Sequence, residues 1–301
     1  MKPVIGFVGT GAMGAPMAQN LLKAGYPLVV YDLREKAMED LVKAGAEKAS
    51  SAKELAGRSS VVITMLPASP DVETAVLGPQ GVMAGDKSGD IVIDMSSSYP
   101  TSTKSICERL AVKGIRMLDA PVSGGVKGAR EGTLTIMVGG EEKDYAECHP
   151  ILEAMGQNIY YLGKIGAGHT VKALNNLCSA CSMIITSEAL IVAKKLGLNP
   201  EKVINAINSG TGRSWSSQFK FPTFVLTNKF NSGFSIGLMN KDLEIATRLG
   251  RELNVPMSVG KVVQQLYNHA VECGAGDDCH TAIIKFIEDW RGVKARSKKG
   301  G

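Results

Sequence analysis

A helix-length apolar stretch near the middle of the chain carries a lysine and two amides. Lys172 and Asn176 are four residues apart, so in a helix they share one face, and Asn175 lies close to that face. A lysine there suits a proton donor with an amide that positions it. A lysine that snorkels at the start of a helix would give the same pattern, so the residue types leave both interpretations open.

A second segment, formed by Ser123, Gly124 and Gly125, follows a candidate strand. Its two glycines leave backbone N–H groups unobstructed, and such groups can form a nest for an anion such as a substrate carboxylate. A plain turn would use the same residues, so the segment by itself does not decide between the two.

A glycine-rich turn follows the first candidate strand and opens the first candidate helix. It has the spacing G-x-G-x-x-G and consists of Gly9, Thr10, Gly11, Ala12, Met13 and Gly14. The first glycine permits the tight turn, the second lets a pyrophosphate approach the backbone, and the third lets the helix pack on the strand. The start of the helix then faces the phosphate charge. With an acidic residue at the end of the next strand, this context predicts a dinucleotide-binding site.

That acidic residue is Asp32, and it bears on the choice of dinucleotide. A carboxylate at this place accepts hydrogen bonds from the ribose hydroxyls of NAD and repels the 2′-phosphate of NADP. Arg34 could accommodate that phosphate instead, or it could be a solvated charge at a helix start. We therefore expect NAD, with NADP as the alternative, and count Asp32, Leu33 and Arg34 among the cofactor-binding residues.

Two further strand ends are expected to line the cofactor. In an open parallel sheet the ligand lies beyond the carboxyl ends of the strands. The residues that follow two candidate strands in this way are Met65, Leu66, Pro67, Ser96 and Ser97.

Elements that could position these residues alternate along the first half of the chain. Short apolar runs rich in β-branched residues predict strands over 4–8, 28–32, 61–66, 91–95, 117–120, 133–138 and 159–162, with amphipathic helices between them. Alternation of this kind indicates a mostly parallel sheet covered on both faces. From 167 to 196 the chain reads as one long helix, and further helices are predicted over 200–209, 239–253, 256–273 and 278–290.

The predicted fold class is thus α/β, with an N-terminal doubly wound dinucleotide-binding domain over 1–163. A long connecting helix leads into an all-helical domain over 164–293, expected to serve substrate binding and oligomerisation. A flexible basic tail is predicted over 294–301, where four of the positive charges are Lys294, Arg296, Lys298 and Lys299.

Composition excludes several classes of protein. Apolar residues make up 44% and charged residues 21% of the chain, as in ordinary globular proteins. No uninterrupted apolar run reaches the roughly 18 residues of a membrane span. The net charge of +5 comes largely from the tail, which argues against a nucleic-acid partner. Six scattered cysteines and the lack of a signal-peptide pattern predict a cytoplasmic protein.

No metal site is expected. Cys273, Cys279 and His280 lack a full set of ligands for zinc. Cys178 and Cys181 have the C-x-x-C spacing of a redox motif, but they lie within an apolar helix, where core packing is the better interpretation.

The motifs occur in one order along nearly the whole chain, from IGFVGTGAMGAPMAQNLLKAG through ITMLPASPDV, IDMSS, LDAPVSGG, GTLTIMVGG and GAGHTVKALNN to GLMNKDLEIA. This set resembles the β-hydroxyacid dehydrogenase family, whose best-known type acts on 3-hydroxyisobutyrate. One departure is Thr10, because most members carry an apolar residue there. The resemblance implies an NAD(P)-dependent oxidoreductase that acts on CH–OH groups. The long apolar helix and the helical second domain predict a homodimer or homotetramer, because so much apolar helix surface needs to be covered.

The resemblance also implies roles for individual residues. Lys172 would be the general acid/base, and Asn176 would orient Lys172 or the substrate. Lys241 would reach the nicotinamide side of the cofactor, with Asp242 as a structural partner nearby. The substrate carboxylate would be held by Ser123, Gly124 and Gly125, with Asn175 beside them.

The substrate is expected to be a 3-hydroxy acid of about three to four carbons, oxidised to its semialdehyde. The loop over 209–217 contains a Trp-Ser-Ser piece that resembles the 3-hydroxyisobutyrate type. Arg213 could pair with a second anionic group or lie on the surface, and Phe234 is a candidate apolar wall. Other segments resemble the tartronate-semialdehyde branch, so the alternative is a tartronate-semialdehyde, glyoxylate or succinic-semialdehyde reductase that uses NADPH.

Two other functions share this fold. A noncatalytic NAD-binding module would be marked by loss of the lysine, and the imine-reducing branch usually replaces it. The presence of Lys172 argues against both.

Overall fold

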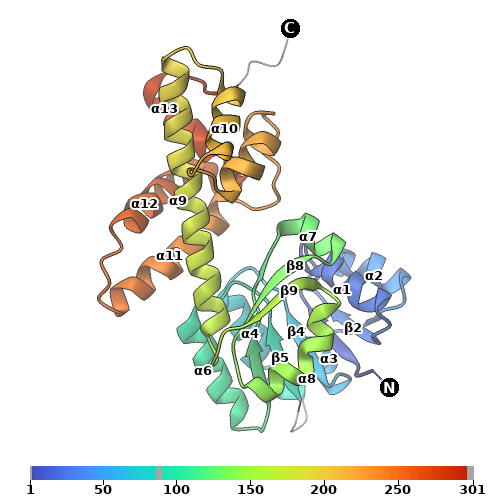
Figure 1. Cartoon of the computed structure of the whole chain (residues 1–301). Coiled ribbons are helices and arrows are strands. Elements are labelled where there is room, and N and C mark those ends of the chain that lie inside the picture. Colours follow the sequence, from blue (N-terminus) through green and yellow to red (C-terminus); the bar gives the residue numbers. More distant parts are fainter. Residues whose placement is uncertain (1, 86–89, 297–301) are drawn as a thin grey trace. The chain divides into compact units, whose positions relative to one another are not determined.

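The computed structural model describes residues 2–85 and 90–296. The chain forms two compact units, Met1–Lys172 and Ala173–Gly301 (Figure 1). The first is an α/β unit and the second is helical, as the sequence predicts.

The first unit is built on a six-stranded sheet in which all neighbouring strands are parallel. The spatial order is β3-β2-β1-β4-β5-β6, so the direction of strand order reverses between β1 and β4. Ligands bind at such a switch point in doubly wound folds. The strands are β1 (Ile5–Val8), β2 (Leu28–Tyr31), β3 (Glu47–Lys48), β4 (Val61–Thr64), β5 (Ile91–Asp94) and β6 (Arg116–Asp119).

Apolar residues fill both faces of this sheet. Alternate residues of a strand point to opposite faces, so Phe7 and Ile63 belong to one buried cluster while Val8 and Val62 belong to another. This is why the strands are almost continuously apolar. The helices of the unit are α1 (Gly14–Lys23), η1 (Glu35–Met38), α2 (Glu39–Lys43), α3 (Ala52–Gly57), α4 (Ser69–Leu77), α5 (Val82–Gly85), α6 (Pro100–Ala111), α7 (Gly125–Glu131) and α8 (Glu142–Glu153).

The last strands of the unit form a separate sheet. β7 (Val122–Ser123) pairs antiparallel with β8 (Leu134–Val138), and β8 pairs parallel with β9 (Gly156–Tyr161). The sequence predicted β8 and most of β9 as strands but gave no sign of a second sheet. β3 and β7 were not predicted because two residues are too few to show an alternating pattern.

The second unit consists of helices around one apolar core, whose largest fully buried side chains include Phe221 and Tyr267. A π-helical segment, η2, was not predicted, since Pro222 and several serines interrupt its apolar pattern. The helices are α9 (Ala167–Lys195), α10 (Pro200–Ser209), η2 (Ser216–Val225), α11 (Ile236–Glu252), α12 (Ser258–Ala270), η3 (Val271–Ala275), η4 (His280–Ile283) and α13 (Ile284–Arg291).

Helix α9 agrees closely with the predicted long helix, but the division between the units falls after Lys172 and not at 163/164. The reason is that Gly166 and His169 donate hydrogen bonds to Asp119 in the first unit. By length and composition α9 could cross a membrane, with a mean hydropathy of 1.5 over its most apolar window. Half of that window is buried in the protein, and the core helix of a folded protein passes the same test of length and composition.

The tail predicted to be flexible from Lys294 is packed at its start. Ala295 is buried, and the guanidinium of Arg296 binds the buried carboxylate of Glu288 at 2.6 Å. Arg296 also donates to Asn228 at 3.0 Å and lies over the ring of Phe230. The prediction is therefore wrong for Ala295 and Arg296, while Lys298 and Lys299 lie outside the described residues.

Replacing Arg296 with Met should destabilise the helical unit by about 3–5 kcal/mol, because the carboxylate of Glu288, 1% exposed, would be left buried without its cation. Urea unfolding followed by circular dichroism would measure this. Arg248→Met is the matched control, because the pair between Arg248 and Glu252 is exposed and contributes about 0–1 kcal/mol. Equal losses in the two variants would contradict an anchoring role for Arg296.

Candidate active site

The glycine-rich turn has the shape that its sequence predicts. Gly9 has a φ of +94°, and a Cβ there would overlap the backbone oxygen of Met65. A Cβ on Gly14 would overlap the backbone oxygen of Gly9, so the start of α1 must pass close to the turn. Gly11 differs, since the nearest atom to its Cβ position is Nη2 of Arg34 at 3.6 Å. The turn is thus closed at its first and third glycines and open at its second, which suits a pyrophosphate.

Asp32 and Arg34 lie together beside this turn. The Asp32 carboxylate accepts the N–H of Thr10 at 2.8 Å and the N–H of Arg34 at 2.9 Å. The Arg34 guanidinium lies 3.6 Å from the same carboxylate, with 73% of its side chain exposed. Leu33, between them, is 89% exposed. The acidic and basic groups that favour opposite dinucleotides therefore form one ion pair at the edge of the site.

The other two strand ends meet the turn at the carboxyl edge of the sheet. Gly9 packs on the backbone of Met65, and the N–H of Leu66 donates to the Ser96 hydroxyl at 2.9 Å. Ser96 is fully buried, Ser97 is half-buried and Pro67 is exposed. The structure thus brings the segments after β1, β4 and β5 together, and their contact with the cofactor stays a prediction.

The Ser-Gly-Gly segment joins β7 to α7. Gly124 and Gly125 have φ angles of +135° and +64°, a region that other residues rarely adopt. Nothing lies within 4 Å of a Cβ position on Gly125, so its backbone is open on that side. Both glycines are needed by the backbone itself, and the open side leaves room for an anion.

Lys172 is half-buried on α9, and Asn176 follows one turn later. The Asn176 amide donates to Asp242 at 2.5 Å and accepts from Asn175 at 3.1 Å. Asp242 is almost fully buried, and the Lys241 ammonium lies 3.2 Å from its other oxygen, which receives no hydrogen bond of good geometry. Through its contact with Asn176, Asp242 joins α11 to α9. Asp242 and Asn175 are therefore the groups that fix the Asn176 amide.

The two residues proposed for the substrate tail differ in environment. Arg213 is exposed in the segment between α10 and η2. Phe234 is half-buried and packs edge-to-face on His280, with ring centroids 5.6 Å apart. Burial, aided by the positive charge of Lys220, holds the pKa of His280 well below its usual value, so the ring is neutral near pH 7. Phe234 packs against the apolar core of the helical unit, and its role as a wall for the substrate stays a prediction.

Sequence reasoning missed a buried polar cluster in the first unit. Asp94, Asp119 and His169 each have essentially no exposed surface, and the histidine ring lies 3.6 Å and 3.7 Å from the two carboxylates. Each aspartate ends an apolar strand. This position at the end of a strand is the one signal in the sequence that could have pointed to the two aspartates.

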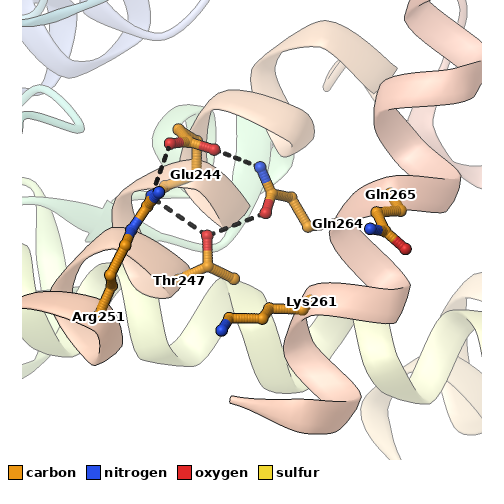
Figure 2. A pocket seen from close by; sticks show the side chains of 6 residues that line it. All are labelled: Glu244, Thr247, Arg251, Lys261, Gln264 and Gln265. Atoms are coloured by element: carbon orange, nitrogen blue, oxygen red, sulfur yellow. Dashed lines mark hydrogen bonds and ion pairs between the residues drawn. The ribbon is translucent and has the colours of Figure 1, made fainter. Parts of the chain in front are cut away.

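A cavity of about 330 Å³ lies elsewhere, between α11 and α12, and Figure 2 shows its polar lining. Its Glu244 carboxylate accepts from Gln264 and binds Arg251 at 3.5 Å. None of the predicted site residues lines it. The lining residues are Glu244, Thr247, Arg251, Lys261, Gln264 and Gln265.

All six cysteines are free thiols. Within residues 2–85 and 90–296, no group of three His, Cys, Asp or Glu side chains is arranged to hold a metal ion.

Comparisons with known proteins agree with this geometry. Residues 4–163 match the family model described as the NAD binding domain of 6-phosphogluconate dehydrogenase. Residues 166–287 match a second family model, described as NAD-binding of NADP-dependent 3-hydroxyisobutyrate dehydrogenase. A 2-(hydroxymethyl)glutarate dehydrogenase from Eubacterium barkeri is 41% identical over 96% of both chains. The chain belongs to the β-hydroxyacid dehydrogenase family. This dehydrogenase is an NAD(P)-dependent enzyme that acts on the CH–OH group of small 3-hydroxy acids.

Two further relatives of the dehydrogenase act by name on 3-hydroxyisobutyrate. The enzyme from Pseudomonas aeruginosa is 39% identical over 88% of this chain and 91% of its own. A solved structure of the Mycobacterium tuberculosis enzyme with L-serine has a TM-score of 0.88 at 34% identity, over 95% of this chain and 99% of that one. The dehydrogenase therefore shares both its α/β unit and its helical unit with the family.

The glycine turn of the dehydrogenase yields a paired prediction. Gly11→Ala should leave the melting temperature unchanged, because its Cβ has room, but should weaken NADH binding at least roughly tenfold by obstructing the pyrophosphate. Gly9→Ala should lower the melting temperature, because φ is positive and the Cβ overlaps Met65. Thermal unfolding and NADH fluorescence titration measure the two effects. Unchanged NADH affinity in Gly11→Ala would place the pyrophosphate elsewhere.

Proposed function

We propose that this dehydrogenase oxidises a 3-hydroxy acid of about three to four carbons, similar to 3-hydroxyisobutyrate, to its semialdehyde with NAD. The observation that carries the proposal is the position of Lys172 on the first turns of α9, where it can serve as a proton acceptor and donor. The same chain has a glycine turn that is open at Gly11, as binding of a dinucleotide requires. The names of the relatives from Pseudomonas aeruginosa and Mycobacterium tuberculosis support this substrate class.

The residues present fit a nicotinamide dinucleotide. The turn from Gly9 to Gly14 would hold the pyrophosphate, Asp32 the ribose, and the segments at Leu66 and Ser96 the rest of the cofactor, with Lys241 on the nicotinamide side. When bound, the cofactor supplies the hydride acceptor.

Lys172 is the general base in oxidation and the general acid in reduction. In oxidation its neutral amine takes the proton of the substrate hydroxyl, and in reduction its ammonium returns that proton to the carbonyl oxygen. The backbone of Ser123, Gly124 and Gly125, which is open on the side of Gly125, binds the substrate carboxylate. Asn176, held by Asp242, orients Lys172 or the substrate from the same helix.

Lys172→Ala should lower turnover by roughly 10²–10⁴, the usual size of a general acid/base contribution, while the Kd for NADH stays the same. Initial rates with 3-hydroxyisobutyrate and NADH titration measure the two quantities. Lys127→Ala, an exposed lysine on α7, is the matched control and should leave turnover unchanged. Near-normal turnover in Lys172→Ala would remove its assigned role.

The substrate branch is tested by rates across a panel of acids. The panel contains 3-hydroxyisobutyrate, D-glycerate, L-serine and 4-hydroxybutyrate, and turnover of any of them would identify an enzyme for monocarboxylates. The acid that is turned over fastest would distinguish the 3-hydroxyisobutyrate type from the alternative semialdehyde reductases. The Eubacterium barkeri relative is named for 2-(hydroxymethyl)glutarate, a dicarboxylate, which makes that acid the second candidate. Exposed Arg213 would then meet the second carboxylate. No turnover of any acid, with NADH binding intact, would favour a noncatalytic NAD-binding module.

Cofactor preference depends on the Asp32–Arg34 pair. We expect NAD to be preferred, because Asp32 sits where it would meet the ribose hydroxyls, and residual use of NADP to depend on Arg34. Arg34→Ala should lower kcat/KM for NADP by roughly tenfold and change kcat/KM for NAD less than about twofold. Rates with both cofactors decide this. A larger loss with NAD than with NADP would contradict the assignment.

The proposal extends to assembly and location. Apolar side chains are exposed along the helical unit, which favours a homodimer or homotetramer that covers them. They include Ile185, Val192, Leu196, Val259 and Val262, each more than half exposed. Light scattering after size exclusion would give the subunit number. Six free thiols support a reducing compartment such as the cytoplasm.

A further inference from the structure

The carboxylate of Asp119 accepts hydrogen bonds from the start of α9. Its two oxygens receive the N–H of Gly166 at 2.6 Å and the N–H of His169 at 2.7 Å. The first N–H groups of a helix have no partner within the helix, and a negative charge at that end is favourable. Asp119 therefore acts as a cap for α9, although it lies 50 residues from His169 in the sequence.

The ring of His169 makes two hydrogen bonds that determine its tautomer. Nε2 lies 3.1 Å from the backbone oxygen of Ser96, which can only accept, so Nε2 carries a proton. Nδ1 lies 2.8 Å from the Thr103 hydroxyl. The same hydroxyl lies 3.2 Å from the backbone oxygen of Tyr99. In the neutral ring Nδ1 is an acceptor, so the single Thr103 proton is donated to Nδ1, the nearer of the two acceptors. The ring thus has one orientation that satisfies both nitrogens.

A second carboxylate completes the cluster. Asp94 Oδ2 is 3.6 Å from Nε2 of His169. Asp94 accepts from the Thr64 hydroxyl at 2.9 Å, the Ser96 N–H at 3.0 Å and the Ser98 hydroxyl at 2.7 Å. Every member is buried, and a fully satisfied buried network is rigid.

This network joins the segments on which the reaction depends. Ser96 accepts from Leu66 through its hydroxyl and from His169 through its backbone oxygen, so the two cofactor-lining segments are tied to α9. Lys172 lies three residues after His169 on α9, within one turn of the helix. Asp119 is four residues before Ser123, so the substrate-binding segment begins at the same cluster.

We propose that His169 is a positioning residue, which fixes the first turn of α9, and with it Lys172, relative to the cofactor-lining segments at Leu66 and Ser96. The inference rests on the proposed role of Lys172. Displacement of a catalytic group by about 1 Å can cost on the order of 10²-fold in rate, which sets the scale of the effect.

The test compares two substitutions of the same histidine. The Gln side chain reaches the Nε2 position and can donate to the Ser96 oxygen, whereas the shorter Asn side chain cannot. His169→Asn should lower kcat for 3-hydroxyisobutyrate by roughly tenfold or more, with the Kd for NADH changed less than about twofold. His169→Gln should recover most of the loss. His149→Asn, a partly exposed histidine on α8, is the matched control and should leave kcat unchanged.

A double-mutant cycle identifies the group through which His169 acts. Because its effect passes through Lys172, His169→Asn should cause little further loss in a Lys172→Ala background. Losses that multiply, or a normal kcat in His169→Asn alone, would overturn the inference and leave the proposed function intact. Near-normal turnover in Lys172→Ala would overturn the proposed function and the inference with it.

Thr103→Val provides a second variant that keeps the side-chain shape and removes only the hydroxyl. It should lower kcat in the same direction as His169→Asn and add little to it in the double variant. An unchanged kcat in Thr103→Val, or full additivity, would overturn the inference even if His169→Asn fails to fold.

Discussion

The start of α9 and the carboxylate of Asp119 each require what the other supplies. The helix begins with N–H groups that lack internal partners, and a buried carboxylate is costly unless donors surround it. Both needs are met where Gly166 and His169 donate to Asp119 at the end of β6. The strand that leads toward Ser123 and the helix that carries Lys172 therefore share one buried residue, so the candidate substrate segment and the candidate proton donor are built on the same contact.

Close approach of backbone to backbone is the second constraint on this unit. A Cβ on Gly168 would overlap the Met137 oxygen and lie 2.8 Å from the backbone oxygen of Asp119, so α9 can dock only because residue 168 is glycine. The same reasoning applies at Gly9 and Gly14, where the turn, β4 and α1 converge. These glycines thus serve dense packing, and of the three glycines of the phosphate turn only Gly11 keeps an open side.

In the helical unit, polar groups are placed where the core meets α9. Asn176 and Asp242 join α9 to α11 by a buried hydrogen bond of 2.5 Å, and Asn175 and Lys241 flank it. Such a bond is specific in direction, whereas the surrounding apolar contacts are not. It sets the rotation of this part of α9 about its own axis, because the face that carries Asn176 is turned toward α11.

The sequence by itself determined the features that depend on local pattern. Glycine spacing after a strand identified the turn from Gly9 to Gly14, and apolar periodicity identified α9 and most strands of the main sheet. The tertiary structure decided what depends on residues far apart in the chain. His169 binds Ser96 across 73 positions, Asn176 binds Asp242 across 66, and Arg296 is held by residues of two other segments. Such pairs leave no periodic signal, because only the folded topology brings the carboxyl ends of β5 and β6 to the first turn of α9.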